Sequence, residues 1–278
     1  MGLARSVQRP VLGARRLVGR GPVVMTRRGG VHWALDLREG IDFAIWLQGR
    51  FEPSTAAAYR RLLRPGATVL DVGANIGAHT LPMARAVGPT GTVVAFEPTA
   101  SAYGRLQANL ARNPELARRV TTLQAMLLAS GAEALPAQVV SSWPLLPRRE
   151  LHAVVPGRPQ ATTGARATTL DAAVAELGLD AVDLVKLDVD GYECDVLDGA
   201  KVTLDRFRPP VLTEVAPFVL EEAGREIAEL LDRLDAFGYD LRSTNGAHPF
   251  TRADAAELSR RQASANVLAV HRDAAARP

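Results

Sequence analysis

The sequence contains a single cysteine, Cys194, among its 278 residues. One thiol excludes an intrachain disulfide framework and a zinc site built on cysteines, and it is typical of a reducing compartment, so we expect a cytoplasmic protein. Apolar runs that approach the ~18 residues of a membrane span are also missing, which excludes stable membrane insertion. No period of 20–50 residues repeats, so solenoid and propeller folds are excluded too.

Acidic residues are absent from the first 35 positions, where the chain carries seven arginines; the first acid is Asp36. The formal net charge of +3 therefore divides unevenly, because the rest of the chain holds 26 basic against 30 acidic residues. An arginine-rich, acid-free start is typical of a targeting peptide, a nucleic-acid arm, an electrostatic membrane contact or a partly disordered extension. We expect the last of these, a basic and flexible extension over residues 1–30. No apolar signal region is present, which argues against secretion.

The sequence does contain a regular alternation of short apolar runs and helical patterns. With 47% hydrophobic and 23% charged residues, its composition is that of a globular protein. The alternation predicts an α/β fold, Rossmann-like, with a mostly parallel twisted sheet, helices on both faces and an antiparallel last strand. The predicted strands are Thr68–Val72, Thr92–Glu97, Val120–Leu123, Val182–Asp188, Val211–Val215, Tyr239–Arg242 and Asn266–His271. The predicted helices are His79–Val87, Ala100–Arg112, Leu170–Leu177, Cys194–Leu204 and Arg225–Phe237.

Two segments do not follow this alternation. Residues 31–66 combine an alternating stretch, Val31–Phe51, with a helical one, Pro53–Leu63, and we expect them to form a small cap beside the sheet. The stretch Gly131–Arg166 is rich in Pro, Ser, Ala and Arg and has no clear period. A long irregular insert in a compact domain is usually a functional lid or a disordered loop. We expect residues 131–166 to form a substrate lid within a main domain of residues 67–278.

The stretch "VLDVGANIGAHT", residues 69–80, carries the strongest signal for a ligand. In open parallel sheets ligands bind where a strand ends and its helix begins, and glycine permits positive φ and the close approach of a ligand. A dinucleotide turn requires G-x-G-x-x-G, but this chain has Asp71, Gly73, Asn75 and Gly77 at alternate positions. That pattern disfavours a nicotinamide-dependent oxidoreductase, which remains the alternative enzyme class. The Asp71 carboxylate suits an ammonium or sulfonium group better than a diphosphate.

A second signal follows 20 residues after Gly77, where the strand "TVVAFEP" ends in Glu97. A carboxylate at the tip of the second strand can accept the hydroxyl protons of a ribose. A nucleoside without phosphates that bears a cationic amino acid is S-adenosylmethionine. We therefore predict that Asp71, Gly73, Asn75, Gly77 and Glu97 bind S-adenosyl-L-methionine.

These motifs, together with "TTLDAAVAELGLDAVDLVKLDVDGYECDVLDGA", resemble the FkbM-type methyltransferases, a class I S-adenosylmethionine-dependent family. The resemblance covers roughly residues 31–240 and includes "GRFEP" and "VLTEV". It implies methylation of hydroxyl groups, often on sugars or polyketide-type natural products, and it implies that Gln124 and Ala125 read the adenine ring. The chain departs from the family at Asp190, where glutamate is more usual, and at Cys194, where leucine is usual. Both departures concern the acceptor rather than the cofactor.

The catalytic candidates lie in "DLVKLDVDGYECD" and on the following strand. Lys186 and Asp188 alternate onto one face, and a buried lysine needs a partner, either Asp188 or Glu214. A structural ion pair is the alternative interpretation. Because an aliphatic hydroxyl is a poor nucleophile, we expect a general base, with Asp188 first and Lys186, Glu193 and Glu214 as further candidates. The pair Asp188-x-Asp190 could hold Mg²⁺, but such spacing is common by chance and no metal is assigned.

The expected partner is a small hydroxylated molecule, and no nucleic acid is expected. The turn of the D-P-P-Y type that holds planar amines in many N-methyltransferases is absent, which disfavours nitrogen acceptors. A non-catalytic S-adenosylmethionine-binding module with the same fold remains a second alternative, which turnover would exclude. No pattern in the sequence indicates an oligomeric state.

Overall fold

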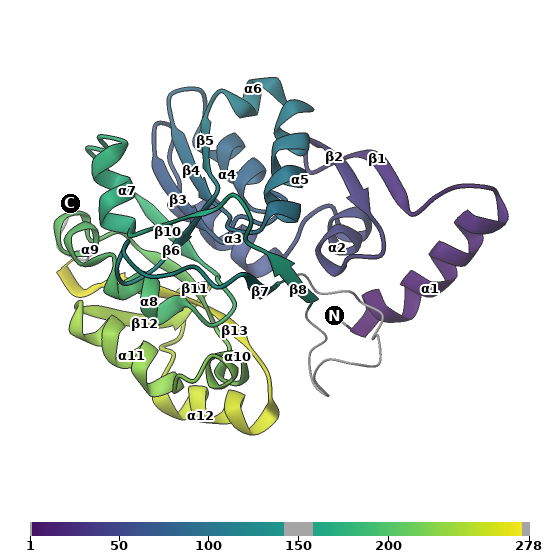
Figure 1. The fold of residues 1–278 in the computed structure, drawn as a ribbon. Coiled ribbons are helices and arrows are strands. Elements are labelled where there is room, and N and C mark those ends of the chain that lie inside the picture. The colour runs from purple at the N-terminus through teal and green to yellow at the C-terminus, as the bar shows by residue number, and fades with distance from the viewer. Residues whose placement is uncertain (1, 142–157, 274–278) are drawn as a thin grey trace.

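The computed structural model describes residues 2–141 and 158–273. Its centre is a seven-stranded sheet (Figure 1), made of β3 (Thr68–Val72), β4 (Thr92–Phe96), β5 (Val120–Leu123), β10 (Leu184–Leu187), β11 (Val211–Val215), β12 (Tyr239–Ser243) and β13 (Ala265–His271). The strand order is β12-β13-β11-β10-β3-β4-β5. Every neighbouring pair from β11 to β5 is parallel, and β13 runs antiparallel to both β11 and β12. The predicted Rossmann-like architecture and its antiparallel last strand are confirmed.

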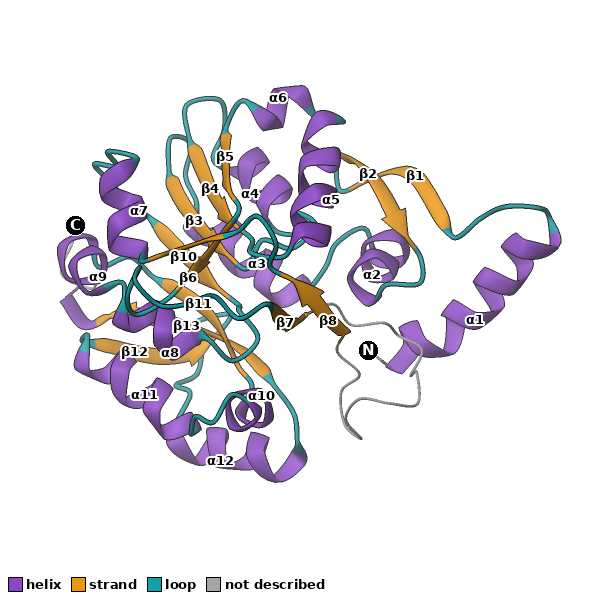
Figure 2. Ribbon diagram, viewed as in Figure 1, coloured by secondary structure: helices purple, strands orange, loops and turns teal. Residues whose placement is uncertain are grey.

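Helices cover both faces of this sheet (Figure 2). They are α4 (Thr80–Ala86), α5 (Ala100–Ala111), α6 (Pro114–Ala117), α7 (Leu170–Glu176), α8 (Glu193–Asp198), α9 (Lys201–Phe207), α10 (Pro217–Glu222), α11 (Ile227–Ala236) and α12 (Arg252–Arg261). Helices α6, α10 and α12 were not predicted. Of these, α10 and α12 lie between β11 and β13 in the chain.

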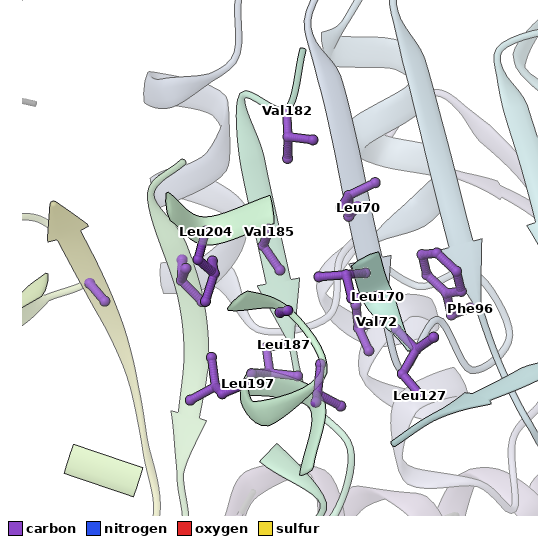
Figure 3. Packing of buried hydrophobic residues seen from close by; sticks show 14 of the residues in the cluster. Leu70, Val72, Phe96, Leu127, Leu170, Val182, Val185, Leu187, Leu197 and Leu204 are labelled. Carbon is purple, nitrogen blue, oxygen red and sulfur yellow. The ribbon is translucent and has the colours of Figure 1, made fainter. Parts of the chain in front are cut away.

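The two faces of the sheet bury alternate residues of the same strands. In β3, Leu70 joins the core beneath α7, α8 and α9, whereas Val69 joins the core on the side of α4. Figure 3 shows the first of these cores, where Val185 and Leu187 of β10 lie among leucines from the covering helices. A strand covered on both faces is apolar at nearly every position. Lys186 is the polar exception in β10, and its position marks a functional or structural pair.

The predicted helix Cys194–Leu204 is divided into α8 and α9. Helix α8 ends at its C-cap, Gly199, whose carbonyl accepts the backbone N–H of Asp171 at 3.0 Å. A Cβ on Gly199 would lie 2.2 Å from the carbonyl oxygen of Leu128, so only glycine fits at this position. The carboxylate of Asp171 then accepts the backbone N–H groups of Val202 and Thr203, which begins α9 from outside the helix. Free N–H groups at a helix start need such acceptors.

The N-terminal segment differs from the expected flexible extension. Residues 2–17 form α1 (Gly2–Leu17), and β1 (Val23–Arg28) pairs antiparallel with β2 (Val31–Asp36), so the boundary expected at residues 30 and 31 falls inside a hairpin. Val7 and Val11 of α1 pack against the core of the cap, and the side chain of Gln8 donates to the carbonyl of Leu37 at 2.6 Å. Buried contacts order this segment despite its charge.

The cap continues through α2 (Gly40–Gln48) and α3 (Pro53–Leu62). The insert is flanked by β6 (Ala125–Leu127) and β9 (Arg166–Thr168), which pair with each other, and within it β7 (Gln138–Ser141) pairs with β8 (Arg158–Ala161). Residues 142–157, which include Trp143 and His152, lie outside the described residues. Within the described ranges, no helix combines the length and the apolar character that crossing a bilayer requires.

Candidate active site

A cavity of about 460 Å³ opens at the edge of the sheet where the parallel strands end. Ligands of open α/β sheets bind at this edge. Its walls come from the ends of β3, β4 and β10, from β6, and from residues 262–264 ahead of β13. Of the predicted site residues, those that line it are Gly73, Asn75, Glu97, Ala125, Lys186, Asp188 and Glu214, whereas Asp71, Gly77, Gln124 and Glu193 do not.

The turn after β3 has the left-handed backbone that its glycines indicate, with φ of +83° at Gly73 and +87° at Gly77. A Cβ at Gly73 would lie 1.7 Å from the carbonyl oxygen of Asp188, and one at Gly77 would lie 2.8 Å from Leu106. The neighbour that requires glycine at position 73 is therefore the end of β10. This close approach brings the turn and the catalytic candidates to one cavity.

Glu97 links the glycine turn to the end of β4. One carboxylate oxygen accepts the backbone N–H of Asn75 at 2.9 Å, and the other accepts the N–H of Thr99 at 2.8 Å and its hydroxyl at 2.5 Å. Burial raises the pKa of Glu97, against the lowering effect of these hydrogen bonds. A carboxylate has about four acceptor positions, so capacity remains for a ligand hydroxyl. The glutamate is thus held rigidly at the cavity wall.

The wall next to Glu97 is apolar. Phe96, Ala125, Met126 and Leu127 line it, and all four are buried. An apolar wall beside a polar group suits an adenine ring and its ribose, because ligand pockets combine apolar walls with a few polar groups. The side chain of Gln124 points elsewhere and donates to the carbonyl of Thr163 at 2.8 Å. Of the pair expected to read adenine, only Ala125 therefore lies at the cavity.

Asp71 lies beneath the glycine turn rather than in the cavity, and it is fully buried. One of its oxygens accepts the hydroxyl of Thr80 at 2.5 Å, and the other lies 3.9 Å from the Lys186 ammonium. Asp71 and Lys186 are register partners on the neighbouring strands β3 and β10. Asp71 is thus paired inside the protein, and its expected contact with a cationic ligand stays a prediction.

Lys186 reaches from β10 to the cavity, where its ammonium lies 3.0 Å from an Asp188 oxygen. Asp188 is thus the nearer of the two partners expected for this lysine. Burial disfavours the charged form, but the carboxylates of Asp188 and Asp71 outweigh it and raise the pKa of Lys186 above its ordinary value. The Lys186 ammonium therefore lies near two carboxylates: Asp71, which is buried beneath the glycine turn, and Asp188, which lines the cavity.

Two further acids, Asp190 and Glu214, face the same part of the cavity. Burial and then the charge of Asp188 raise the pKa of Glu214 to about 8, while a hydrogen bond from Ser264 opposes the shift. The same two causes raise the pKa of Asp190 well above its usual range. Glu214 is therefore mostly protonated near neutral pH and can donate a hydrogen bond there.

Replacing Glu214 should alter how stability depends on pH. The pKa of Glu214 is raised from its ordinary value of 4.5 to about 8 in the folded protein. The contribution of Glu214 to stability is therefore full below pH 4.5 and is lost as the pH rises to 8. Between pH 5 and pH 8 the wild type should therefore lose more stability than Glu214→Gln, by ~1 kcal/mol or more. Denaturant titrations at both pH values measure it, with the exposed Glu221→Gln as control. Equal pH slopes would contradict it.

Glu193 has a structural position. Its carboxylate accepts the backbone N–H groups of Val189 and Gly191, both at 3.1 Å, and it does not line the cavity. Burial raises its pKa to about 7. Asp190, between its two backbone partners, adopts a φ of +50°. Glu193 thus holds the strained loop that presents Asp190, and as placed it cannot touch a ligand in the cavity.

The cap closes the cavity through Glu52. Its oxygens accept from His79 Nε2 at 3.2 Å and from the side-chain amide of Asn266 at 2.9 Å, and Glu52 has a φ of +39°. Burial would raise the pKa of Glu52, but the hydrogen bond from His79 lowers it to about 2. The His79 ring also packs against Phe51 and Tyr59. The cap, the glycine turn and β13 are therefore joined at one carboxylate.

Several lining residues were not predicted. Val139 and Val140 lie in the insert that was expected to form the substrate lid, but they were not named individually. No expectation covered the others, which lie in the loop after β10, in helix α10 and in the loop after α12: Tyr192, Phe218, Val219, Gln262, Ala263 and Ser264. No pattern marked these loops, because their approach to the cavity depends on the whole fold. Across the described ranges, no three His, Cys, Asp or Glu residues are grouped so as to hold a metal ion.

Comparison with known proteins agrees with this geometry. A family model described as the methyltransferase FkbM domain matches residues 71–241. The AMB antimetabolite synthetase AmbE of Pseudomonas aeruginosa is 32% identical over 222 residues, and methyltransferase sdnD of Sordaria araneosa is 30% identical over 193 residues. These alignments cover 70% and 57% of this chain, and 10% and 73% of the two relatives.

Among solved structures, methyltransferase FkbM from Methylobacillus flagellatus matches with a TM-score of 0.45 and 15% identity. The match covers 78% of this chain and 50% of that one, so the chain spans half the length of this structure and a tenth of AmbE. The family model, which covers more than half of the chain, includes the glycine turn, Glu97 and the strand of Lys186. The chain belongs to the FkbM methyltransferase family.

Proposed function

We propose that this protein transfers a methyl group from S-adenosylmethionine to a hydroxyl group of a small metabolite, such as a sugar or a polyketide-type compound. The observation that carries the proposal is the single cavity that joins two sets of residues. The first set is the glycine turn, Glu97 and the apolar wall, and the second is Asp188, Asp190 and Glu214. The first set suits a nucleoside, and the second suits proton transfer.

The residues present fit the cofactor. A ribose beside Glu97 would donate its hydroxyl protons to the carboxylate, and an adenine ring would lie between Phe96 and the segment Ala125–Leu127. A volume of about 460 Å³ is within the range of small-molecule sites. When bound, S-adenosylmethionine supplies an electrophilic methyl group on a sulfonium.

The chain's own part in the reaction is to orient the acceptor and to take its proton. Lys186 pairs with one oxygen of Asp188 and leaves the other for the acceptor hydroxyl. The free oxygen of Asp188 would take the proton that the acceptor hydroxyl loses on methylation. Glu214, protonated near neutral pH, can hold a second acceptor oxygen in place. Positioning of this kind accounts for much of the rate in group transfer.

Binding of S-adenosylmethionine tests the cofactor assignment directly. We expect the purified protein to bind S-adenosylmethionine and S-adenosylhomocysteine but not NAD, because Asn75 stands in the turn where a dinucleotide site needs glycine. Isothermal titration calorimetry with the three ligands measures this. Tight binding of NAD without a response to either adenosyl compound would favour the oxidoreductase alternative.

Glu97→Ala should weaken S-adenosylmethionine binding by about tenfold or more, which corresponds to ~1.5–3 kcal/mol for charge-assisted hydrogen bonds. It should also lower the melting temperature, since Asn75 and Thr99 lose their acceptor. Glu97→Gln keeps the shape and one acceptor oxygen, so it should separate the two effects by retaining more stability than affinity. An unchanged dissociation constant in both variants would remove Glu97 from the cofactor site.

Turnover distinguishes an enzyme from a non-catalytic module. Incubation with S-adenosylmethionine labelled in its methyl group and a panel of hydroxylated glycosides and polyketides should transfer label to at least one hydroxyl. A matched panel in which the hydroxyls are replaced by amines tests the choice of acceptor. Label that appears only on the amines would overturn the assignment to O-methylation.

A further inference from the structure

Exposed aliphatic side chains are concentrated in the segment that joins α1 to β1. Leu17 is 89% exposed, Val18 68%, Met25 63% and Val23 49%. In the described part of the chain only three other large hydrophobic side chains are exposed, and they are scattered over it. In Figure 1 this segment is the part of the described chain that projects farthest from the central sheet. A gathering of exposed apolar groups marks an interaction site.

The segment has a defined shape rather than a frayed one. The guanidinium of Arg15 donates to the carbonyl of Gly21 at 2.8 and 3.0 Å and to that of Val23 at 3.3 Å. Gly19, with a φ of +69°, closes the end of α1 through its N–H to Arg16. These contacts hold the turn so that Leu17 and Val18 point to solvent.

The strand β1 presents its outer face in the same region. Its partner residues Trp33 and Leu35 on β2 are buried in the cap, and they lie opposite Thr26 and Val24. Because side chains alternate across a strand, Val23, Met25 and Arg27 belong to the opposite, outer face. The hairpin thus carries an apolar core on one side and an apolar and basic surface on the other.

The charge of this region is of one sign. None of its described arginines forms an ion pair with a described residue, and they are Arg9, Arg15, Arg16, Arg20, Arg27 and Arg28. The first acid, Asp36, is already paired with Arg38 at 2.6 Å. The remainder of the chain carries an excess of acids, with 26 basic against 30 acidic residues after residue 35. The surface is therefore complementary to an anionic partner.

A hollow of about 560 Å³ adjoins Met25 on this surface. Arg27, His32 and Arg112 line it, and no carboxylate does. Arg27 and His32 lie directly opposite each other across the strand pair. Two guanidinium groups and an imidazole are suitable donors for phosphate oxygens. The hollow thus offers phosphate binding directly beside an exposed apolar side chain.

We propose that residues 15–32 dock peripherally on a membrane surface that contains anionic phospholipids. Leu17, Val18 and Met25 would enter the interfacial layer, while the arginines face lipid phosphates. This combination of aliphatic and basic groups is that of interfacial membrane contacts. Surfaces that bind single-stranded nucleic acid instead add aromatic side chains for base stacking, and the tryptophan at the hollow, Trp33, is 2% exposed. The proposal does not depend on the catalytic assignment.

Co-sedimentation of the full chain with lipid vesicles tests this docking. We expect binding to phosphatidylcholine vesicles that contain phosphatidylglycerol and none to phosphatidylcholine alone. Binding should fall steeply between about 0.1 M and about 1 M salt, as the screening length falls from ~10 to ~3 Å. Free inorganic phosphate at matched concentration should not release the protein, because it lacks the apolar contact.

Two variants separate the apolar from the charged contribution. Leu17→Ser with Val18→Ser should weaken vesicle binding by about tenfold or more, whereas the control Val202→Ser, which removes an exposed valine from α9, should have no effect. Arg16→Glu with Arg20→Glu should weaken it by about a hundredfold or more, since each unit of charge contributes about fivefold and each substitution changes the charge by two. Unchanged melting temperatures verify the fold of each variant.

Three results would overturn the proposal. These are equal binding to neutral and anionic vesicles, retention of both variants at the wild-type level, and binding of duplex DNA in the absence of vesicle binding. A further result would also contradict membrane docking: the protein binds no vesicles, forms a dimer, and loses that dimer in the Leu17→Ser, Val18→Ser variant. The surface would then be a contact between two copies.

Discussion

Asp188→Asn is expected to lower the rate of methyl transfer by ~10²–10⁴ while it leaves the affinity for S-adenosylmethionine within a few-fold. Asparagine keeps the size of the side chain and one carbonyl oxygen, so the cavity wall survives. The proton acceptor is lost, and the hydroxyl of the acceptor must then attack without general-base assistance. Turnover with labelled S-adenosylmethionine and calorimetric titration give the two quantities.

The exposed Asp180→Asn serves as the control for Asp188→Asn, and Asp190→Asn serves as the comparison within the cavity. Wild-type turnover in Asp188→Asn would show that another group takes the proton. Glu214 then becomes the better candidate, since it lines the cavity, whereas Glu193 is bonded to the backbone of its own loop. A base with the raised pKa of Glu214 would make the rate increase as the pH rises through about 8.

Lys186→Met is expected to destabilise the fold by ~3–5 kcal/mol, the cost of leaving a buried charge without its partner. Lys186 is 2% exposed and lies between Asp71, which is fully buried, and Asp188. Methionine fills much of the same volume, so the loss measures charge rather than packing. Urea unfolding followed by circular dichroism gives the free energy of unfolding.

Lys201→Met is the matched control, because Lys201 is the other lysine of this chain and is exposed on α9. Its effect should stay within about 0.5 kcal/mol. The double variant Lys186→Met, Asp71→Asn should recover part of the lost stability, because it removes the uncompensated carboxylate. A double variant that is less stable than Lys186→Met alone would show that Asp71 acts mainly through its bond to Thr80.

The sequence by itself determined the sheet and the position of the cavity on it. The predicted bounds of β3, β5 and β11 agree with the structure residue by residue, because strands are short runs of β-branched and apolar residues between turn residues. The glycine turn and the position of Glu97 could also be predicted, since a left-handed backbone and a carboxylate at a strand tip are local features. The pairing of Lys186 followed from the cost of burying a charge.

The tertiary structure alone decided what each polar side chain faces. Asp71 and Glu193 were predicted from their place in or after a strand and Gln124 from the family resemblance, yet each bonds to protein groups outside the cavity. Conversely, the contact of Glu52 with Asn266 joins residues 214 positions apart. Local pattern places a residue at the sheet edge, but the direction of its side chain depends on which donors and acceptors distant segments bring there. The ordered N-terminus has the same cause, because only the folded cap supplies the surface against which α1 packs.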